Sequence, residues 1–479
     1  MRRLFLITSL LLFFAFIHDY AQAQIMEQKI DSLFAEYNTP TTPGVAVVVV
    51  QNGTVVFKKG YGMANLEYNI PITTQTGFHV ASVSKQFTAF AIYLLKQQGK
   101  ISLEDDVRKY IPELPVYNKI IRIKHLLAHT SGLRDQWATL TLAGWQMEDI
   151  ITTEQIIKLA CRQKSLNFET GTQFGYCNTG YTLLAEIVSR VTQHSFADFT
   201  THHIFQPLGM TNTRFNDDFH NVIRNSAHSY ELRQDQFIER RLNYATVGAT
   251  SLVTTAEDLA LWVNNFRHPV VGDVKLINEF NQNSLLDNGK PVVWSASPGD
   301  TVYHAKGQLN LYYKGLQRTS HGGHDAGFRA VLLRFPEENL AVITLSNNEH
   351  YTMLAKANPV VDIYLKDQIK EPAVATPNFN SNHIDPNIAS FKNELLDFTG
   401  IYTSDELATT YMIKKKGDQL IMTHNRCSDM ILQPEGEDTF SGVNTFSFQL
   451  KFIRTRHKVT GFEISNFGAK EVKFNRKKQ

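Results

Sequence analysis

The segment Ser82-Val83-Ser84-Lys85 leads into a run, 87–95, that is apolar almost all the way round a helix. Such a helix is buried on every side, so the chain must build a core around it. Residues i and i+3 share one helix face, which places the Lys85 amine beside the Ser82 hydroxyl. The helix N-terminus also favours negative charge near Ser82. The segment therefore predicts a serine nucleophile with a neighbouring base.

The S-x-x-K spacing needs its context to carry this interpretation. A bare match arises by chance about once or twice in a chain like this one, and then marks a surface serine and a solvated lysine. Here Lys85 lies at the buried end of a core helix, where a charge without a partner or a function is costly. We therefore interpret Ser82 and Lys85 as functional residues.

The first 23 residues have the pattern of a secretory signal peptide. Arg2 and Arg3 precede an apolar stretch, 4–17, and small residues follow at a cleavage-site pattern, 21–23. The alternative is a membrane anchor, but the stretch is short for a spanning helix, and no later segment is long and apolar enough to span a bilayer. The sequence predicts cleavage after residue 23 and export to the periplasm or the extracellular space.

Charge and cysteine content exclude some classes of protein. The chain has 48 Lys and Arg and 46 Asp and Glu, a formal net charge of +2, which gives no reason to expect a nucleic-acid partner. Its three cysteines, Cys161, Cys177 and Cys427, are too few for a disulfide framework. We expect mostly buried thiols, with a Cys161–Cys177 bridge as the alternative. The length of 479 residues predicts more than one domain.

Strand signals stand at both ends of the first 350 residues or so, with helix signals between them. Two β-branched runs, 45–50 and 54–57, flank an Asn-Gly pair, a strong hairpin signal. Two more runs, 328–335 and 340–345, predict a second hairpin. One sheet closed by its first and last segments, with helices packed on it, is an α+β arrangement.

The rest of the chain divides into helical, linker and all-β segments. Helices are expected between the hairpins, with a capping-box-like start at Ser102 and an amphipathic run over 256–266. Residues 368–391 are polar and proline-containing, which is typical of a linker. Short strand signals then predict a small barrel or sandwich over 392–479. The α+β domain accordingly spans 24–367.

Tyr176-Cys177-Asn178 is a second candidate functional segment. It precedes a helix-like run, 181–191. A tyrosine near a cationic lysine can have a lowered pKa and act as a general base, and Asn178 can donate to a substrate carbonyl and brace Lys85. Taken singly, Tyr176 is better explained as an aromatic packed at a helix start with a satisfied hydroxyl.

His321-Gly322-Gly323 is the third candidate segment. It precedes His324 and the strand expected from 328. Glycines on a strand allow a ligand or another backbone to approach closely. Taken singly, the triplet also fits a glycine-rich bulge.

Together the three motifs, at 82–85, 176–178 and 321–323, resemble the serine β-lactamase and penicillin-binding protein superfamily. The branch resembled contains class C β-lactamases, D-alanyl-D-alanine carboxypeptidases and related esterases and D-aminopeptidases, in which Y-x-N replaces S-D-N and H-x-G often replaces K-T-G. The resemblance covers about residues 28–350. It extends to four flanking segments: Gly60-Tyr61-Gly62, IKHLLAHTSGL at 123–133, IFQPLGM at 204–210 and TTAEDL at 254–259.

The resemblance implies a β-lactamase/transpeptidase-like fold, an antiparallel sheet flanked by helices with a helical subdomain. It implies that Ser82 attacks a carbonyl carbon and forms an acyl-enzyme, with Lys85 and Tyr176 sharing the proton transfers. The oxyanion would lie between the backbone N–H groups of Ser82 and His324. The implied substrate-binding residues are Asn178, His321, Gly323 and His324.

The third motif departs from K-T-G at His321 and Gly322. A neutral imidazole attracts a β-lactam carboxylate less than an ammonium does, so efficient β-lactamase activity is not expected. His321 is expected to contact either the substrate carboxylate or Tyr176. The module from 392 resembles the lipocalin-like β-domain appended to many such hydrolases, and could cap the site or bind substrate.

The sequence thus predicts an exported serine hydrolase that cleaves an ester or an amide, D-amino-acid peptides among them, through an acyl-enzyme on Ser82. The alternative is a non-catalytic, penicillin-binding-like receptor that keeps the pocket without turnover. The expected partner is a small-molecule or peptide substrate. No cofactor and no metal are expected, because His125 and His129 have zinc-helix spacing but Leu126 replaces the glutamate of H-E-x-x-H.

Overall fold

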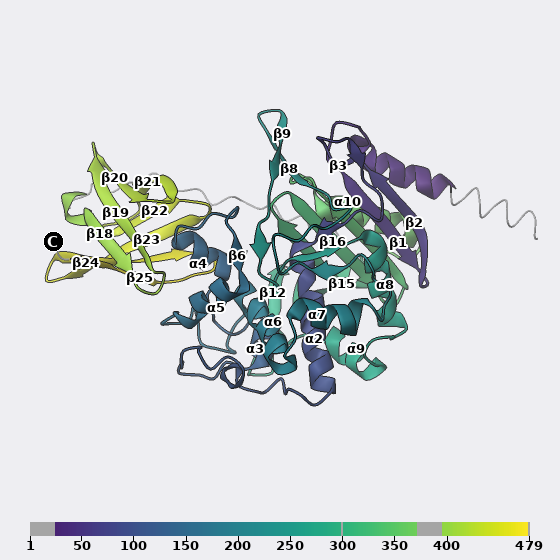
Figure 1. Ribbon diagram of the computed structural model, residues 1–479, viewed down its shortest axis with the longest axis horizontal. Coiled ribbons are helices and arrows are strands. Elements are labelled where there is room, and N and C mark those ends of the chain that lie inside the picture. The colour runs from purple at the N-terminus through teal and green to yellow at the C-terminus, as the bar shows by residue number, and fades with distance from the viewer. Residues whose placement is uncertain (1–23, 298–299, 371–394, 478–479) are drawn as a thin grey trace, which may run out of the picture.

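The computed structural model describes residues 24–297, 300–370 and 395–477. An α+β domain is followed by a closed β-barrel, drawn in yellow-green in Figure 1. The predicted signal peptide, 1–23, lies outside the described residues, as does the predicted linker, 368–391, from residue 371 onward. Across the described ranges, no helix has the length and apolar character needed to cross a bilayer.

The α+β domain is built on one antiparallel sheet with strand order β12-β13-β14-β15-β16-β17-β1-β2. Asn52 and Gly53 both have positive φ, 51° and 82°, as a tight hairpin turn requires, and they join β1 to β2. β1 also pairs with β17, so the first and last segments of the domain meet in the sheet, which confirms the predicted α+β arrangement. The strands are β12 (Val293–Ser297), β13 (Asp300–Ala305), β14 (Gln308–Tyr313), β15 (Leu316–Asp325), β16 (Phe328–Phe335), β17 (Leu340–Ser346), β1 (Val45–Gln51) and β2 (Thr54–Tyr61).

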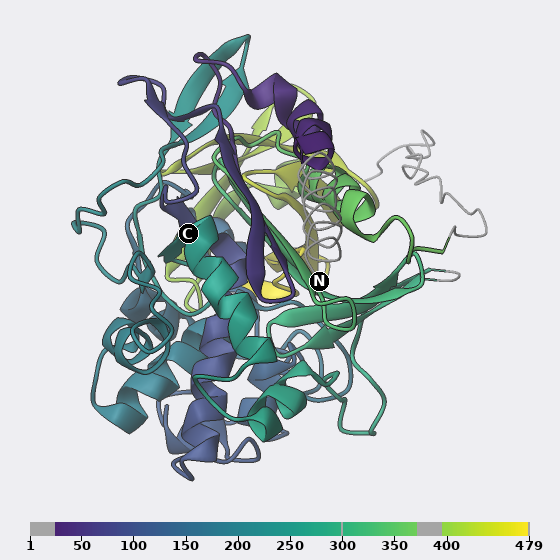
Figure 2. The same ribbon diagram turned by 90° about the vertical axis from the view of Figure 1, so that its right-hand side faces the viewer.

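The central strands are buried on both faces because helices cover both sides of the sheet (Figure 2). Along β1 the side chains alternate between two cores, as the two-residue period of a strand requires. Val45, Val47 and Val49 pack in the core that contains residues of the N-terminal helix, 24–34, and of α10 (Met353–Leu365). Ala46 and Val48 face the larger core around α2 (Ser84–Gln97).

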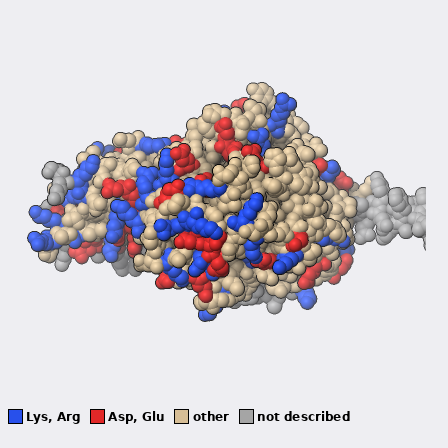
Figure 3. Space-filling model, turned by 60° about the horizontal axis from the view of Figure 1, so that its bottom comes forward, with Lys and Arg blue, Asp and Glu red and all other residues tan. Residues whose placement is uncertain are grey.

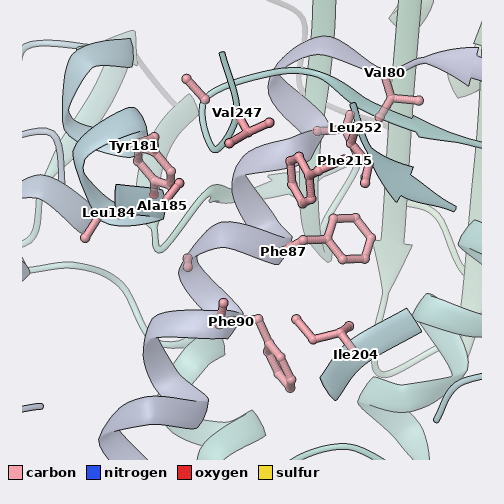
Figure 4. Close-up of a cluster of buried hydrophobic side chains, with 14 of the residues drawn as sticks. Val80, Phe87, Phe90, Tyr181, Leu184, Ala185, Ile204, Phe215, Val247 and Leu252 are labelled. Atoms are coloured by element: carbon pink, nitrogen blue, oxygen red, sulfur yellow. The ribbon is translucent and has the colours of Figure 1, made fainter. Parts of the chain in front are cut away.

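Helix α2 runs through the centre of that larger core. Every residue from Ser84 to Leu95 is buried, which confirms the predicted core helix. Figure 4 shows Phe87 and Phe90 of α2 among side chains from other elements, including Tyr181, Ile204 and Leu252. The other helices are α3 (Ile123–Leu127), α4 (Gln136–Leu142), α5 (Thr153–Cys161), α6 (Asn178–Thr192), α7 (Phe196–Thr200), α8 (Ala256–Arg267) and α9 (Val274–Asn281).

The predicted helix start at Ser102 is wrong. The Ser102 backbone N–H donates to Asp105 Oδ2 and the Ser102 hydroxyl accepts from Glu104 N, so the side chains close a tight turn instead of capping an α-helix.

The short helical turns are η1 (Ala35–Tyr37), η2 (Ala81–Val83), η3 (Val107–Lys109), η4 (Thr201–Phe205) and η5 (Leu395–Phe398). The small strands are β3 (Met63–Asn65), β4 (Ile70–Pro71), β5 (Phe78–His79), β6 (Ile151–Thr152), β7 (Arg214–Phe215), β8 (Ser229–Arg233), β9 (Gln236–Arg240), β10 (Tyr244–Ala245) and β11 (Leu252–Thr254).

The C-terminal module is a closed eight-stranded barrel, and it confirms the predicted all-β domain. Its strands alternate between buried and solvent-facing residues, as in β23, where Phe448, Leu450 and Phe452 point inward. Five of the strands carry clear sequence signals, whereas β18, β21 and β22 went unpredicted because polar residues interrupt them. The strands are β18 (Gly400–Ser404), β19 (Thr409–Lys416), β20 (Gln419–His424), β21 (Cys427–Pro434), β22 (Thr439–Val443), β23 (Ser447–Thr455), β24 (Lys458–Asn466) and β25 (Val472–Arg476).

The barrel and the α+β domain share a packed interface. Apolar residues of α4, including Leu140 and Leu142, belong to the same buried cluster as the barrel interior. Arg134 and Glu406 form a buried ion pair between the two domains.

On the face of the molecule in Figure 3, positive and negative side chains are interspersed, so this face presents no extended field of one sign.

Candidate active site

Ser82 lies in η2, the turn directly before α2. The preceding residue, Ala81, has a left-handed φ of 47°, a strained conformation that costs about 1–3 kcal/mol in a non-glycine residue. Strand β15 holds this turn, since a Cβ on Gly323 would lie only 2.1 Å from the Val80 carbonyl oxygen. Gly323 therefore supports the serine turn by allowing close backbone packing.

Lys85 is fully buried, with its Nζ atom 3.0 Å from Ser82 Oγ. The same nitrogen donates to Asn178 Oδ1 at 2.8 Å and to the Ala249 carbonyl oxygen at 2.7 Å. Burial lowers the pKa of Lys85 to about 7, and the coulombic effect of Asp135 only partly opposes that shift. A neutral amine can donate to the two carbonyl oxygens while its lone pair accepts from the serine hydroxyl, so the geometry suits a general base.

Asn178 is oriented by Asp135, a buried residue that was not predicted from the sequence. Asp135 Oδ2 accepts from the Asn178 backbone N–H at 2.7 Å and from Asn178 Nδ2 at 2.8 Å, which turns the amide oxygen of Asn178 towards Lys85. Asp135 also caps α4 by accepting from the backbone of Trp137 and Ala138. Its position two residues after the family-like segment 123–133 was the available signal.

Tyr176 donates to Ser82 Oγ at 2.9 Å, across 94 residues of sequence. Its ring packs against His129, with centroids 4.4 Å apart, and His129 Nδ1 accepts from the Cys177 backbone N–H. Desolvation raises the pKa of Tyr176, so the phenol is protonated at neutral pH. This differs from the expectation of a lowered pKa, because removal from water outweighs the lowering effect of the hydrogen bond with Ser82.

The Cys177 thiol is buried and donates to a backbone carbonyl oxygen. Its Sγ atom lies 3.6 Å from the Arg134 carbonyl oxygen, and burial raises its pKa to about 12. All three cysteines are free thiols, so the alternative Cys161–Cys177 bridge is not present. His125 turns to Asp287 at 3.0 Å while His129 turns to Cys177, so the two histidines do not share a ligand position.

Strand β15 forms the side of the site opposite Tyr176. His321 Nδ1 lies 2.6 Å from the Gly322 carbonyl oxygen, which can only accept, so this nitrogen carries the proton. Burial lowers the pKa of His321 to about 4, and its Nε2 atom has no hydrogen-bond partner within the described residues. His321 is therefore a neutral hydrogen-bond acceptor and not an anion-binding cation.

Ser82, Tyr176, Asn178, His321, Gly323 and His324 line one cavity of about 630 Å³. Lys85 lies behind it, in contact with Ser82. The cavity also includes aromatic side chains that sequence reasoning did not select. These are Trp137, Tyr244, Trp294, Phe446 and Phe467, the last two from the barrel. The three motifs, distant in sequence, therefore meet at one cavity. The backbone oxyanion site at Ser82 and His324 stays a prediction.

Comparison with known proteins identifies the family of the part of the chain that carries the three motifs. The sequence matches the Beta-lactamase family over residues 30–365. "Protein flp" of Staphylococcus aureus (strain MRSA252) is 27% identical over 337 residues, which cover 68% of this chain and 64% of that protein. The match thus spans less than two thirds of that relative's length.

Solved structures share the fold. The octameric penicillin-binding protein homologue from Pyrococcus abyssi superposes with a TM-score of 0.63 and 21% identity, covering 94% of this chain and 99% of that one. A D-amino acid amidase from Ochrobactrum anthropi SV3, in complex with L-phenylalanine, gives a TM-score of 0.57 and 25% identity. The match covers 71% of this chain and 97% of the amidase chain. The likeness to the Pyrococcus abyssi protein extends over both the α+β domain and the barrel, since it covers 94% of this chain.

Proposed function

This chain belongs to the β-lactamase-like family of serine hydrolases, and we propose that it is an exported enzyme that cleaves an ester or an amide through an acyl-enzyme on Ser82. One observation carries the proposal. Ser82 Oγ lies between Lys85 Nζ at 3.0 Å and Tyr176 Oη at 2.9 Å. An acceptor and a donor of protons are thus both within hydrogen-bond reach of the nucleophile.

In the proposed reaction, Lys85 and Tyr176 carry the protons. Neutral Lys85 takes the Ser82 proton as Oγ attacks the carbonyl carbon, and Tyr176 gives its proton to the leaving oxygen or nitrogen. The acyl-enzyme then holds a Lys85 ammonium and a Tyr176 phenolate, which stabilise each other. Water attacks the acyl carbon while the phenolate takes its proton, and Lys85 returns a proton to Ser82 Oγ as the acid leaves. Asn178 positions the substrate carbonyl and keeps Lys85 in place.

The charges in the cavity favour substrates without a carboxylate beside the scissile bond. His321 is neutral, and the nearby ionisable groups Asp325 and Glu349 are acidic. The two arginines at the edge of the cavity are paired with glutamates, Arg240 with Glu231 and Arg241 with Glu239. We therefore propose simple esters and amides ahead of β-lactams, with amides of D-amino acids among the candidates, the class named for the amidase of similar fold.

The experiment is a comparison of the mature protein with Ser82→Ala. The wild type should hydrolyse activated esters and form a covalent adduct of the expected mass with a fluorophosphonate, whereas Ser82→Ala should do neither and keep its melting temperature. D-phenylalanine amide, a D-alanyl-D-alanine peptide and a chromogenic cephalosporin extend the screen. A folded wild type that forms a stable adduct but turns over no substrate would favour the alternative, a penicillin-binding-like receptor.

The proposal of export rests on the sequence of residues 1–23. Cell fractionation followed by N-terminal sequencing should find a protein outside the cytoplasm that begins at Gln24. An uncleaved chain in the cytoplasm would contradict it.

A further inference from the structure

We infer that two barrel loops form the outer wall of the active-site cavity and select substrates that carry an aromatic or branched apolar group. The barrel wall consists of Thr445 and Phe446, between β22 and β23, and Phe467, between β24 and β25. The inference rests on the proposed function, since a selected substrate presupposes a reaction at Ser82. According to this inference, the barrel wall determines the substrate specificity of the enzyme.

The barrel wall presents apolar surface to the cavity. Phe446 and Phe467 meet edge to face, with ring centroids 4.7 Å apart and planes at 71°. Phe467 is nevertheless 62% exposed, whereas the apolar side chains of the barrel interior are buried. Because an apolar ring gains free energy when it leaves water, this pair offers a contact that an apolar substrate group would complete.

The loop between β24 and β25, which carries Phe467, is held in place by the α+β domain. The Gly468 carbonyl oxygen accepts from the Asp135 backbone N–H at 2.8 Å and from Asn167 Nδ2 at 2.9 Å. Asn466 Nδ2 donates to the Ala138 carbonyl oxygen at 2.9 Å. These anchors flank Phe467 closely, so its ring is positioned before a substrate arrives and little ordering cost remains.

The α+β domain supplies further aromatic surface to the same cavity. Trp137 and Tyr244 stack with centroids 4.9 Å apart, and Trp294 packs on Tyr176 at 5.1 Å. All four side chains line the same cavity as the barrel wall. An apolar group entering beside Ser82 therefore meets aromatic surface from both domains, whereas a small acyl group would leave the barrel wall in water.

The test measures kcat/KM for p-nitrophenyl acetate and p-nitrophenyl phenylacetate. We expect the wild type to prefer phenylacetate, and the double variant Phe446→Ala/Phe467→Ala to lose about 10- to 100-fold of that preference, the range over which hydrophobic pockets discriminate. The double variant Phe446→Leu/Phe467→Leu, which keeps apolar surface, should retain most of the preference. The matched control is Ile431→Ala, which removes an exposed apolar side chain from the same barrel and should change neither rate.

A second measurement does not depend on turnover. Phenylacetamide is titrated into Ser82→Ala and into the triple variant Ser82→Ala/Phe446→Ala/Phe467→Ala. Tryptophan fluorescence is the signal, because Trp137 and Trp294 line the cavity. Weaker binding without the rings supports the inference. Equal binding, or an unchanged substrate preference in the double variant, overturns it. A wild type that cleaves no ester refutes the proposed function instead, and the titration then still decides the role of the barrel wall.

Discussion

The two walls of the active-site cavity are held together by different forces. The catalytic wall, Ser82, Lys85, Tyr176 and Asn178, is a hydrogen-bonded network in which each polar group has a fixed partner. The barrel wall contributes rings whose contacts are apolar. Proton transfer requires atoms placed to within fractions of an ångström, whereas apolar contact tolerates small shifts. Substitutions in one wall should therefore change either the rate of proton transfer or the substrate preference, but not both. The exception is a residue that supports both walls.

Tyr176→Phe tests the catalytic wall alone and should have the largest effect. It removes the phenol that donates to Ser82 at 2.9 Å, and we expect kcat to fall by about 10²- to 10⁴-fold, the usual contribution of a positioned acid or base. Substrate preference should be unchanged, because the ring remains. Steady-state kinetics with both p-nitrophenyl esters measure both quantities.

Tyr181→Phe is the matched control for that substitution. Tyr181 is also buried near Lys85, but its hydroxyl donates to the Leu127 carbonyl oxygen at 2.9 Å. Its loss should lower the free energy of unfolding by about 1–3 kcal/mol and leave kcat within a few-fold. Equal losses of kcat in the two variants would mean that Tyr176 only packs.

The pH profile tests the same wall through Lys85. Burial lowers the pKa of Lys85 to about 7, and only the neutral amine can accept the Ser82 proton. The rate should be constant above pH 7 and fall about tenfold per pH unit below it, or about 100-fold at pH 5. His321, with a pKa of about 4, stays neutral throughout this window. A flat profile from pH 5 to 8 would exclude Lys85 as the base.

The same pKa shift has a consequence for stability. The unfolded chain holds the Lys85 proton up to its ordinary pKa of 10.5, while the folded protein releases it near pH 7. Between these values the unfolded state binds more protons, so the contribution of Lys85 to the free energy of unfolding rises with pH. Denaturant titrations of the wild type and Lys85→Met across this window measure it.

Gly468→Ala tests the support that the two walls share, and should have the smallest effect on rate. An added Cβ would lie 2.6 Å from the Asp135 Cβ atom and 3.0 Å from that of Ala138. The resulting shift should lower the free energy of unfolding by about 1–3 kcal/mol and reduce kcat about tenfold, because Asp135 orients Asn178. Gly436→Ala, where the new Cβ would have only ordinary contacts, is the control. Unchanged kcat in Gly468→Ala would show that the walls are independent.

Several elements of the fold could be predicted because their signals are local. The Asn-Gly turn between β1 and β2 and the apolar run of α2 each act through residues close in sequence. The barrel was recognised as all-β, although three of its strands were missed where polar residues break the alternation. The prediction at Ser102 is wrong because a serine followed by an acidic residue can either close a turn or cap a helix, and the local spacing does not distinguish the two.

The sequence alone determined that the Ser82 hydroxyl and the Lys85 amine lie side by side, because their i, i+3 spacing at a helix start fixes their proximity locally. Tertiary structure decided which proton each group carries. Burial lowers the pKa of Lys85 to about 7 and raises the pKa of Tyr176, so the phenol stays protonated. The degree of burial depends on packing by segments that are distant in the sequence. It also decided that Asp135, Phe446 and Phe467 belong to the site, since no periodicity in a chain records which loops meet when two separate cores pack together.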